Sequence, residues 1–122
     1  MEIHESAENY LETILVLSHR KGSVRSVDIA LELDYSKPSV SVAMKNLRAS
    51  GYIRTDPDGF ISLTEKGRGV AEAVYERHTF LSEFLMSLGV NEKTSIEDAC
   101  RIEHVISAES FSAIKRFVAD RK

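Results

Sequence analysis

The sequence contains a single cysteine, Cys100, so the chain cannot form an internal disulfide bond. It contains no apolar run near the roughly 20 residues that a membrane-spanning helix needs. The first 18 residues hold four acids and no lysine or arginine, unlike a secretory signal or an organelle-targeting peptide. These absences favour a cytoplasmic protein that has no membrane partner.

The composition is otherwise that of an ordinary globular protein, with 122 residues of which 43% are hydrophobic and 29% are charged. A chain of this length forms one compact unit, or two small units that share a core. Because such a short chain buries only about two-thirds of its unfolded surface, a partner subunit would add stability.

The formal net charge of −3 is unevenly distributed along the chain. Residues 19–54 hold seven bases and three acids, whereas the segments on either side are acidic. A basic block of this kind indicates a surface for nucleic-acid phosphates, although a solvated charged surface explains the charges equally well.

Three helices are predicted in the first part of the chain. Apolar residues recur at helical spacing over residues 5–19. Residues 26–33 form a short helix with Val27, Ile29, Ala30 and Leu33 as its apolar positions, and a third helix follows over residues 37–50 after a turn of three residues. The expected N-cap residues of these helices are Ser6, Ser26 and Ser36.

A short hairpin is predicted after these helices. Strands at residues 52–54 and 60–63 flank the sequence Asp-Pro-Asp-Gly, which favours a tight turn. Two helices joined by a short turn and followed by a hairpin have the order of a winged helix-turn-helix. The two acids of the turn should repel phosphate, so the tip of the hairpin is not expected to contact DNA.

The third helix leaves exposed the residue types that DNA recognition uses. Ser39 and Ser41 can donate to or accept from bases and phosphates, and Val42 can pack on a thymine methyl group. The bases of the same region can reach phosphates. The alternative is a small helical domain whose serines and lysines are solvated. The predicted DNA-contacting residues are Arg25, Ser36, Lys37, Pro38, Ser39, Ser41, Val42, Lys45 and Arg48.

The rest of the chain is predicted to be helical. A long helix of about 24 residues is capped by Thr64 and ends at Leu88, and Gly67 and Gly69 weaken its first turns. Two shorter helices cover residues 95–107 and 109–119, the first of them capped by Ser95. These helices carry more apolar positions than one small domain can cover, which favours a homodimer.

Three types of metal ligand fall on one turn of the predicted helix 95–107. Cys100, Glu103 and His104 are spaced i, i+3 and i+4, which stacks them on one helix face. Thiolate, carboxylate and imidazole are the common side-chain ligands of metal ions. The alternative is a packed thiol beside a surface Glu–His pair.

Two other helices carry further candidate ligands. His78 lies in the apolar stripe of the long helix, where a hydrogen-bonded core histidine is the more frequent situation. Asn9 and Glu12 lie three residues apart beside the apolar face of the first helix, where a solvated helix flank would also explain them. If the three helices pack together, five or six ligands converge.

Four strings of the sequence carry a family resemblance. They are Ala99–Val105 with its Cys-x-x-Glu-His pattern, Glu8–Glu12 near the start, Ser36–Ser41 in the third helix and Arg77–His78 in the long helix. Together they resemble the diphtheria-toxin-repressor and manganese-transport-regulator family, in the same order and over nearly the whole chain.

This resemblance implies a cytoplasmic homodimeric repressor. Such a protein binds double-stranded operator DNA when loaded with Fe2+ or Mn2+, and it can take Zn2+ or Co2+ in vitro. The metal would join the first helix to the long helix and to the Cys-x-x-Glu-His helix. The ligands that the resemblance implies are Asn9, Glu12, His78, Cys100, Glu103 and His104.

The chain also departs from both branches of the family. Cys100 matches the iron-type ligand, whereas Glu12 matches a manganese-type ligand, and Asn9 stands where members have Met or Asp. Ser82 and Ile96 replace ancillary ligands of iron-type members, so a second site of that kind is not expected. The SH3-like third domain of iron-type members is not expected either.

The predicted fold is mainly helical with a small hairpin. Residues 1–64 form the winged helix-turn-helix domain and residues 65–122 the helical metal-binding and dimerisation domain. The alternative function is a metal-independent winged-helix regulator. An enzyme, such as a small metallohydrolase with Glu12 as general base, is not favoured because a compact helical chain offers no evident cleft.

Overall fold

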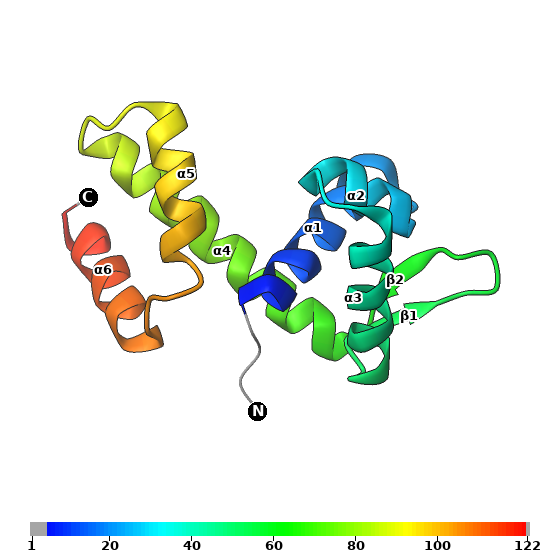
Figure 1. The fold of residues 1–122 in the computed structure, drawn as a ribbon. Coiled ribbons are helices and arrows are strands. Elements are labelled where there is room, and N and C mark those ends of the chain that lie inside the picture. Colours follow the sequence, from blue (N-terminus) through cyan, green and yellow to red (C-terminus); the bar gives the residue numbers. More distant parts are fainter. Residues whose placement is uncertain (1–4, 122) are drawn as a thin grey trace. The chain divides into compact units, whose positions relative to one another are not determined.

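The computed structural model describes residues 5–121, which contain six helices and a two-stranded antiparallel sheet (Figure 1). The chain divides into two compact units, one ending at Ala73 and the other beginning at Val74. The helix α4, Glu65–Ser87, runs through the point of division. None of the described helices is both long and apolar enough to span a bilayer. The mainly helical class with one hairpin is therefore confirmed.

The first unit packs three helices and the hairpin around one core. The helices are α1 (Glu5–Lys21), α2 (Ser26–Leu33) and α3 (Lys37–Ala49), and they end within two residues of their predicted ends. Gly22, which follows α1, has a φ of 86°, a conformation that favours glycine after a helix. The most deeply buried side chains of this core are Leu11, Ile14, Val24, Ile29, Val40 and Ile53.

The predicted N-caps of α2 and α1 are wrong. Ser26 is the first residue of α2 and Arg25 is its N-cap, whose N–H donates to the carboxylate of Asp28 at 2.8 Å. Val27 is 39% exposed, because α2 buries the side that carries Ile29 and Ala30. Ser6 is not a cap, because α1 already includes it.

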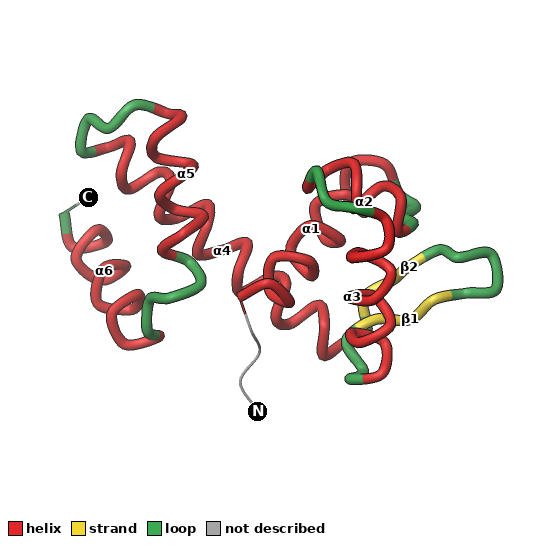
Figure 2. Tube along the Cα trace, viewed as in Figure 1, coloured by secondary structure: helices red, strands yellow, loops and turns green. Residues whose placement is uncertain are grey.

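The hairpin consists of β1 (Ile53–Thr55) and β2 (Ile61–Leu63), each about one residue from its predicted position. The carboxylate of Asp56 accepts the N–H groups of Asp58 and Phe60, both at 2.9 Å, which closes the turn. The N–H of Ile61 donates to the carbonyl of Val24 at 2.7 Å, so β2 is also tied to the residue before Arg25. Figure 2 shows these strands, the only ones among the described residues, beside α3.

The start of α4 is held against the hairpin by Thr64 and Gly67. The hydroxyl of Thr64 accepts the N–H of Gly67 at 3.1 Å and donates to the carbonyl of Gly51 at 2.6 Å. A Cβ atom on Gly67 would lie 2.0 Å from the carbonyl oxygen of Tyr52. The glycine that the sequence marks as a weak point of the helix is therefore needed for close approach of the backbone.

The second unit packs α5 (Glu92–Ile102) and α6 (Ala108–Asp120) with the later turns of α4. Its core contains Leu81, Ala99 and Phe111, with Phe80, Ile102 and Ile106 packed against them. The predicted start of α5 is wrong by three residues. The side chain of Asn91 caps the helix by accepting the N–H of Thr94 at 2.9 Å, while Ser95 is fully buried inside it.

Candidate nucleic-acid interface and metal centre

The structure places the predicted DNA-contacting residues on exposed surface of the first unit. Ser36 caps α3, where its hydroxyl accepts the N–H of Ser39 at 3.3 Å. The buried side of α3 carries Val40, Met44 and Leu47, so the helix presents its polar side outward. The exposed residues in this set are Arg25, Ser36, Lys37, Pro38, Ser39, Ser41, Val42, Lys45 and Arg48.

The centre of the exposed face of α3 is formed by Val42 and Lys45. They lie opposite Val40 and Met44 in the helical period, and Val42 is 60% exposed. Ser39 is less available, because the hydroxyl of Ser36 donates to its hydroxyl at 2.8 Å. The central pair therefore offers one apolar and one cationic contact to a groove.

Arg25 connects the start of α2 with the hairpin. Its guanidinium carbon lies 4.2 Å from the ring centroid of Phe60, within range of a cation–π interaction. Because its side chain is exposed while its backbone N–H is held by Asp28, Arg25 can reach a phosphate from a fixed backbone position.

Two bases of the basic block are engaged within the unit. Arg20 forms an ion pair with Glu32 at 2.8 Å, and Lys21 forms one with Asp28 at 2.6 Å. The hydrogen bonds from Lys21 and from the N–H of Arg25 hold the pKa of Asp28 below its ordinary value. The charge available to DNA phosphates is therefore concentrated on Arg25, on α3 and on Arg54 of the hairpin.

Sequence reasoning did not select two exposed residues of the same surface. Asn46 lies beside Lys45 on α3, and Arg54 lies opposite Ser62 on the exposed side of the hairpin. The strand alternation of Ile53, Arg54 and Thr55 is the signal that would have placed Arg54 outward.

The candidate metal ligands of α5 lie at and just beyond its C-terminal end. The predicted continuation of this helix to residue 107 is wrong, because α5 ends at Ile102 and Glu103 is its C-cap. The backbone of Glu103 keeps helical dihedral angles, with φ −58° and ψ −26°. The ligand atoms of Cys100, Glu103 and His104 consequently still lie within 4.8 Å of one another.

Glu103 is the centre of this cluster. The Nδ1 atom of His78 on α4 lies 2.9 Å from Oε2 of Glu103, and the Nε2 atom of His104 lies 3.2 Å from Oε1. The side chain of Glu103 is fully buried, that of His104 is 2% exposed, and Cys100 is exposed. The structure thus brings four of the six predicted ligands together within the second unit.

The carboxylate of Glu103 tests whether a metal ion fits these residues. Among the described residues, neither of its oxygen atoms takes part in a hydrogen bond of normal geometry, although both are buried. Buried carboxylates are ordinarily hydrogen-bonded or coordinated to a cation. A divalent ion between this carboxylate and the two imidazoles would satisfy the donor atoms, so the residues fit a metal.

The other two predicted ligands, Asn9 and Glu12, belong to the first unit. Both are half-buried on α1. The backbone carbonyl of Asn9 accepts the hydroxyl of Thr13 at 2.8 Å.

The first unit is a winged helix-turn-helix, and the helical unit joined to it carries a buried carboxylate between two histidines. This combination is typical of metal-dependent DNA-binding regulators. Comparison with known proteins gives the family. Residues 2–60 match the iron-dependent repressor N-terminal DNA-binding domain. Residues 64–122 match the iron-dependent repressor metal-binding and dimerisation domain. The chain belongs to the iron-dependent repressor family, which confirms the resemblance to the diphtheria-toxin-repressor and manganese-transport-regulator proteins.

Individual relatives agree with this assignment. An uncharacterised HTH-type transcriptional regulator of Methanocaldococcus jannaschii is 34% identical over 116 residues, which cover 93% of each chain. The transcriptional regulator MntR of Escherichia coli is 34% identical over 113 residues, covering 93% of this chain and 73% of the relative. A solved manganese-dependent transcriptional repressor in complex with manganese has a TM-score of 0.84 at 25% identity, and the match covers 93% of this chain and 52% of that one. The protein is a metal-dependent DNA-binding repressor and not an enzyme.

Proposed function

We propose that this repressor binds its operator as a homodimer when Fe2+ or Mn2+ occupies a site centred on Glu103. The observation that carries the proposal is the fully buried carboxylate of Glu103 between the imidazoles of His78 and His104. The bound ion supplies positive charge to a buried anionic group, and the ligand-bearing elements supply the geometry.

The proposed ligand set draws on both units. Cys100, Glu103, His104 and His78 come from the second unit, and Glu12 and Asn9 come from α1 of the first. Binding energy that depends on ligands from both units favours the arrangement in which they meet. The residues of this chain would in this way set the separation of two recognition helices in a dimer.

The donor types support the choice of metal. Carboxylate and imidazole ligands suit Mn2+ and Fe2+, whereas a thiolate shifts preference toward Fe2+, and toward Co2+ or Zn2+ in vitro. Cys100 is exposed at the edge of the cluster, and the solved relative described above is manganese-dependent. We propose Fe2+ or Mn2+ as the metal that acts in the cell.

The DNA contacts are proposed from the exposed face of the first unit. Lys37, Lys45, Arg48 and Arg25 would contact phosphates, and Ser39, Ser41 and Val42 would contact base edges in the major groove. Ser36 and Pro38 would fix the N-terminal end of α3 beside the DNA backbone. We propose that residues 1–64 carry this function and residues 65–122 carry metal binding and dimerisation, in the cytoplasm where operator DNA lies.

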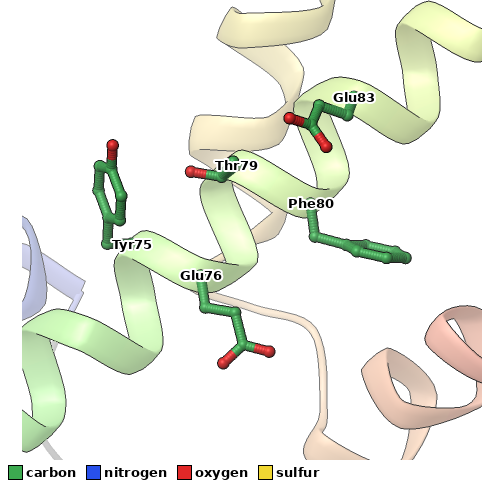
Figure 3. A pocket seen from close by; sticks show the side chains of 5 residues that line it. All are labelled: Tyr75, Glu76, Thr79, Phe80 and Glu83. Atoms are coloured by element: carbon green, nitrogen blue, oxygen red, sulfur yellow. The ribbon is translucent and has the colours of Figure 1, made fainter.

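The homodimer is supported by the exposed apolar residues of the second unit. They include Leu88, which is 65% exposed, and Phe117, which is 52% exposed. An open hollow of about 310 Å³ lies along α4 and is lined by Tyr75, Glu76, Thr79, Phe80 and Glu83 (Figure 3). A second copy that covers such surface would remove it from water and place two recognition helices about one DNA turn, roughly 34 Å, apart.

The test compares metal-dependent DNA binding of the wild type and of His104→Ala. The probe is a duplex selected from a random pool for binding in the presence of Mn2+, and gel shifts are run with Mn2+, Fe2+, Co2+, Zn2+ or chelator. We expect wild type to bind only with metal and His104→Ala not to bind while it remains a folded dimer. His19→Ala, a change of an exposed histidine at the end of α1, is the matched control and should behave like wild type.

Two results would contradict the proposal. Equal binding of wild type in metal and in chelator would remove metal dependence from this chain. Metal-dependent binding by His104→Ala would show that the ligand assignment is wrong.

A further inference from the structure

The backbone of the segment that carries Glu103 is held from α4 by a residue that is not a ligand. Residues 103–107, here called the ligand turn, connect α5 with α6. The guanidinium of Arg77 donates from Nη1 to the carbonyl oxygen of Glu103 at 3.2 Å, in a partly buried position. Arg77 immediately precedes His78, so two neighbouring residues of α4 contact the backbone and the side chain of the same residue.

The position of the accepted carbonyl explains why this contact matters. Glu103 is the C-cap of α5, and the carbonyl groups at the end of a helix lack partners within the helix. A cationic side chain that donates to such a carbonyl satisfies it and interacts favourably with the negative end of the helix dipole. The hydrogen bond therefore restrains the backbone dihedral angles of Glu103, and with them the direction of its side chain.

Arg77 also lies against α6. Its guanidinium carbon is 5.8 Å from the ring centroid of Phe111, and the Phe80 ring meets that ring edge-to-face at 5.6 Å. Phe111 is buried in the first turns of α6, directly after the ligand turn. Because the guanidinium contacts the start of the ligand turn and the helix that follows it, Arg77 spans the segment that carries both Glu103 and His104.

We propose that Arg77 is a positioning residue for the metal site, acting through the ligand turn. Its positive charge would by itself oppose a nearby metal cation, so electrostatic attraction to the metal does not explain its presence. The planar guanidinium can donate to the carbonyl while it packs on an aromatic ring, which a lysine ammonium does less well. This inference rests on the proposed metal site at Glu103.

The test measures metal affinity and coordination in the full-length chain. Arg77→Met and Arg77→Lys are compared with wild type by calorimetric titration with Mn2+ and by the visible absorption spectrum of the Co2+ form. We expect Arg77→Met to lower Mn2+ affinity about tenfold or more, as the loss of outer-shell partners does at other metal sites. The Co2+ bands should shift, and Arg77→Lys should recover part of the affinity.

Arg101→Met is the matched control. Arg101 lies two residues before Glu103 and carries the same charge, but it is exposed and pairs with Asp98 at 3.2 Å. If its loss lowers Mn2+ affinity as much as Arg77→Met does, the effect is one of charge and the positioning role is wrong. The thermal stability of the metal-free variants is measured in parallel, and an affinity loss no larger than the change in folded fraction would likewise reduce Arg77 to a packing residue.

The results also separate this inference from the proposed function. A wild-type chain that binds neither Mn2+ nor Co2+ would overturn both. The wild-type chain could instead bind metal while Arg77→Met keeps the same Mn2+ affinity and the same Co2+ spectrum. That result would overturn only the role of Arg77.

Discussion

A fully buried carboxylate without a well-formed hydrogen bond is costly in a protein interior, and Glu103 makes no such bond to any residue that the structure describes. Its two oxygen atoms lie near the imidazole nitrogens of His78 and His104, so the cost falls when positive charge is supplied. If the proposed metal site is correct, this side chain couples the stability of the second unit to binding of the ion.

Glu103→Gln tests this coupling. We expect loss of Mn2+ affinity larger than the about 10–100-fold that outer-shell changes cause, because a neutral amide replaces the central anionic ligand. The metal-free variant should be at least as stable as metal-free wild type, since a buried charge has been removed. Calorimetric titration and thermal unfolding measure both effects. Glu97→Gln on the exposed surface of α5 is the control, and lower stability of metal-free Glu103→Gln would contradict the argument.

Lys45→Ala tests the division between affinity and specificity on α3. We expect weaker binding to all duplexes by a similar factor and a salt slope smaller by about one unit, because one phosphate contact is lost. Lys93→Ala, on exposed surface of α5, should leave both quantities unchanged. Binding measured across a salt series on selected and random duplexes gives the answer, and a loss confined to the selected duplex would assign Lys45 to base recognition.

At the scale of elements, the first turns of α4 contain two glycines, Gly67 and Gly69, that have different surroundings. A Cβ atom on Gly67 would lie 2.0 Å from the Tyr52 carbonyl oxygen, whereas one on Gly69 would meet nothing within 4 Å. The two positions therefore separate the intrinsic helix propensity of glycine from the space available to it.

We expect opposite effects from alanine at these two glycines. Gly69→Ala should raise the free energy of unfolding by up to about 1 kcal/mol through helix propensity. Gly67→Ala should lower it by about 1–3 kcal/mol or more, because α4 and the backbone of Tyr52 must move apart. Chemical denaturation of both variants measures the difference, and equal stabilisation by both would show that the contact with Tyr52 is not tight.

Asp28 gives the capping of α2 a dependence on pH. Its pKa lies below its ordinary value in the folded chain, through the side chain of Lys21 and the N–H of Arg25. A group with a lowered folded pKa stabilises the fold above its unfolded pKa, about 3.9, and this contribution is lost as the pH falls through the folded pKa.

Asp28→Asn should therefore be less stable than wild type at pH 7, by the about 0.5–2 kcal/mol typical of helix caps. The difference should shrink below about pH 4 and vanish once wild-type Asp28 is protonated. Denaturation at a series of pH values measures this, with Asp58→Asn at the exposed hairpin turn as the control. A difference that is independent of pH would contradict the role of the carboxylate charge.

The elements were predictable where local signals agree. Ser36 before Pro38 and the Asp-Pro-Asp-Gly turn place α3 and the hairpin within about one residue. The start of α5 was not predictable, because Asn91 and Ser95 are both good caps and the choice depends on the burial of Ser95 in tertiary packing. Its end was missed because no glycine or proline marks it.

The candidate site was predictable only in its local part. The spacing of Cys100, Glu103 and His104 brings their ligand atoms together even though the helix ends at Ile102, because Glu103 keeps helical dihedral angles. The hydrogen bond from Arg77 crosses 26 residues of sequence and has no local signal. Contacts of this kind depend on how helices pack, which sequence periodicity does not specify.

At the scale of the whole molecule, self-association is tested by the mass in solution. We expect a homodimer by light scattering, and we expect Phe117→Glu to weaken it about 100-fold or more. A symmetric interface loses the burial of this ring twice, at about 1.5–3 kcal/mol for each copy. Val42→Glu, at an exposed apolar residue of α3, should leave the mass unchanged. A monomeric wild type at micromolar concentration would contradict the homodimer.

The helix α4 contributes Ala71 to the core of one unit and Leu81 to the core of the other, within 23 uninterrupted residues. Since a helix melts cooperatively, unfolding of either core frays the segment on which its neighbour depends. The two units should therefore unfold in a single calorimetric transition, although each has its own core. A ligand that binds one unit raises the free energy of unfolding of that unit. It would then also slow hydrogen exchange of the backbone amides in the other unit.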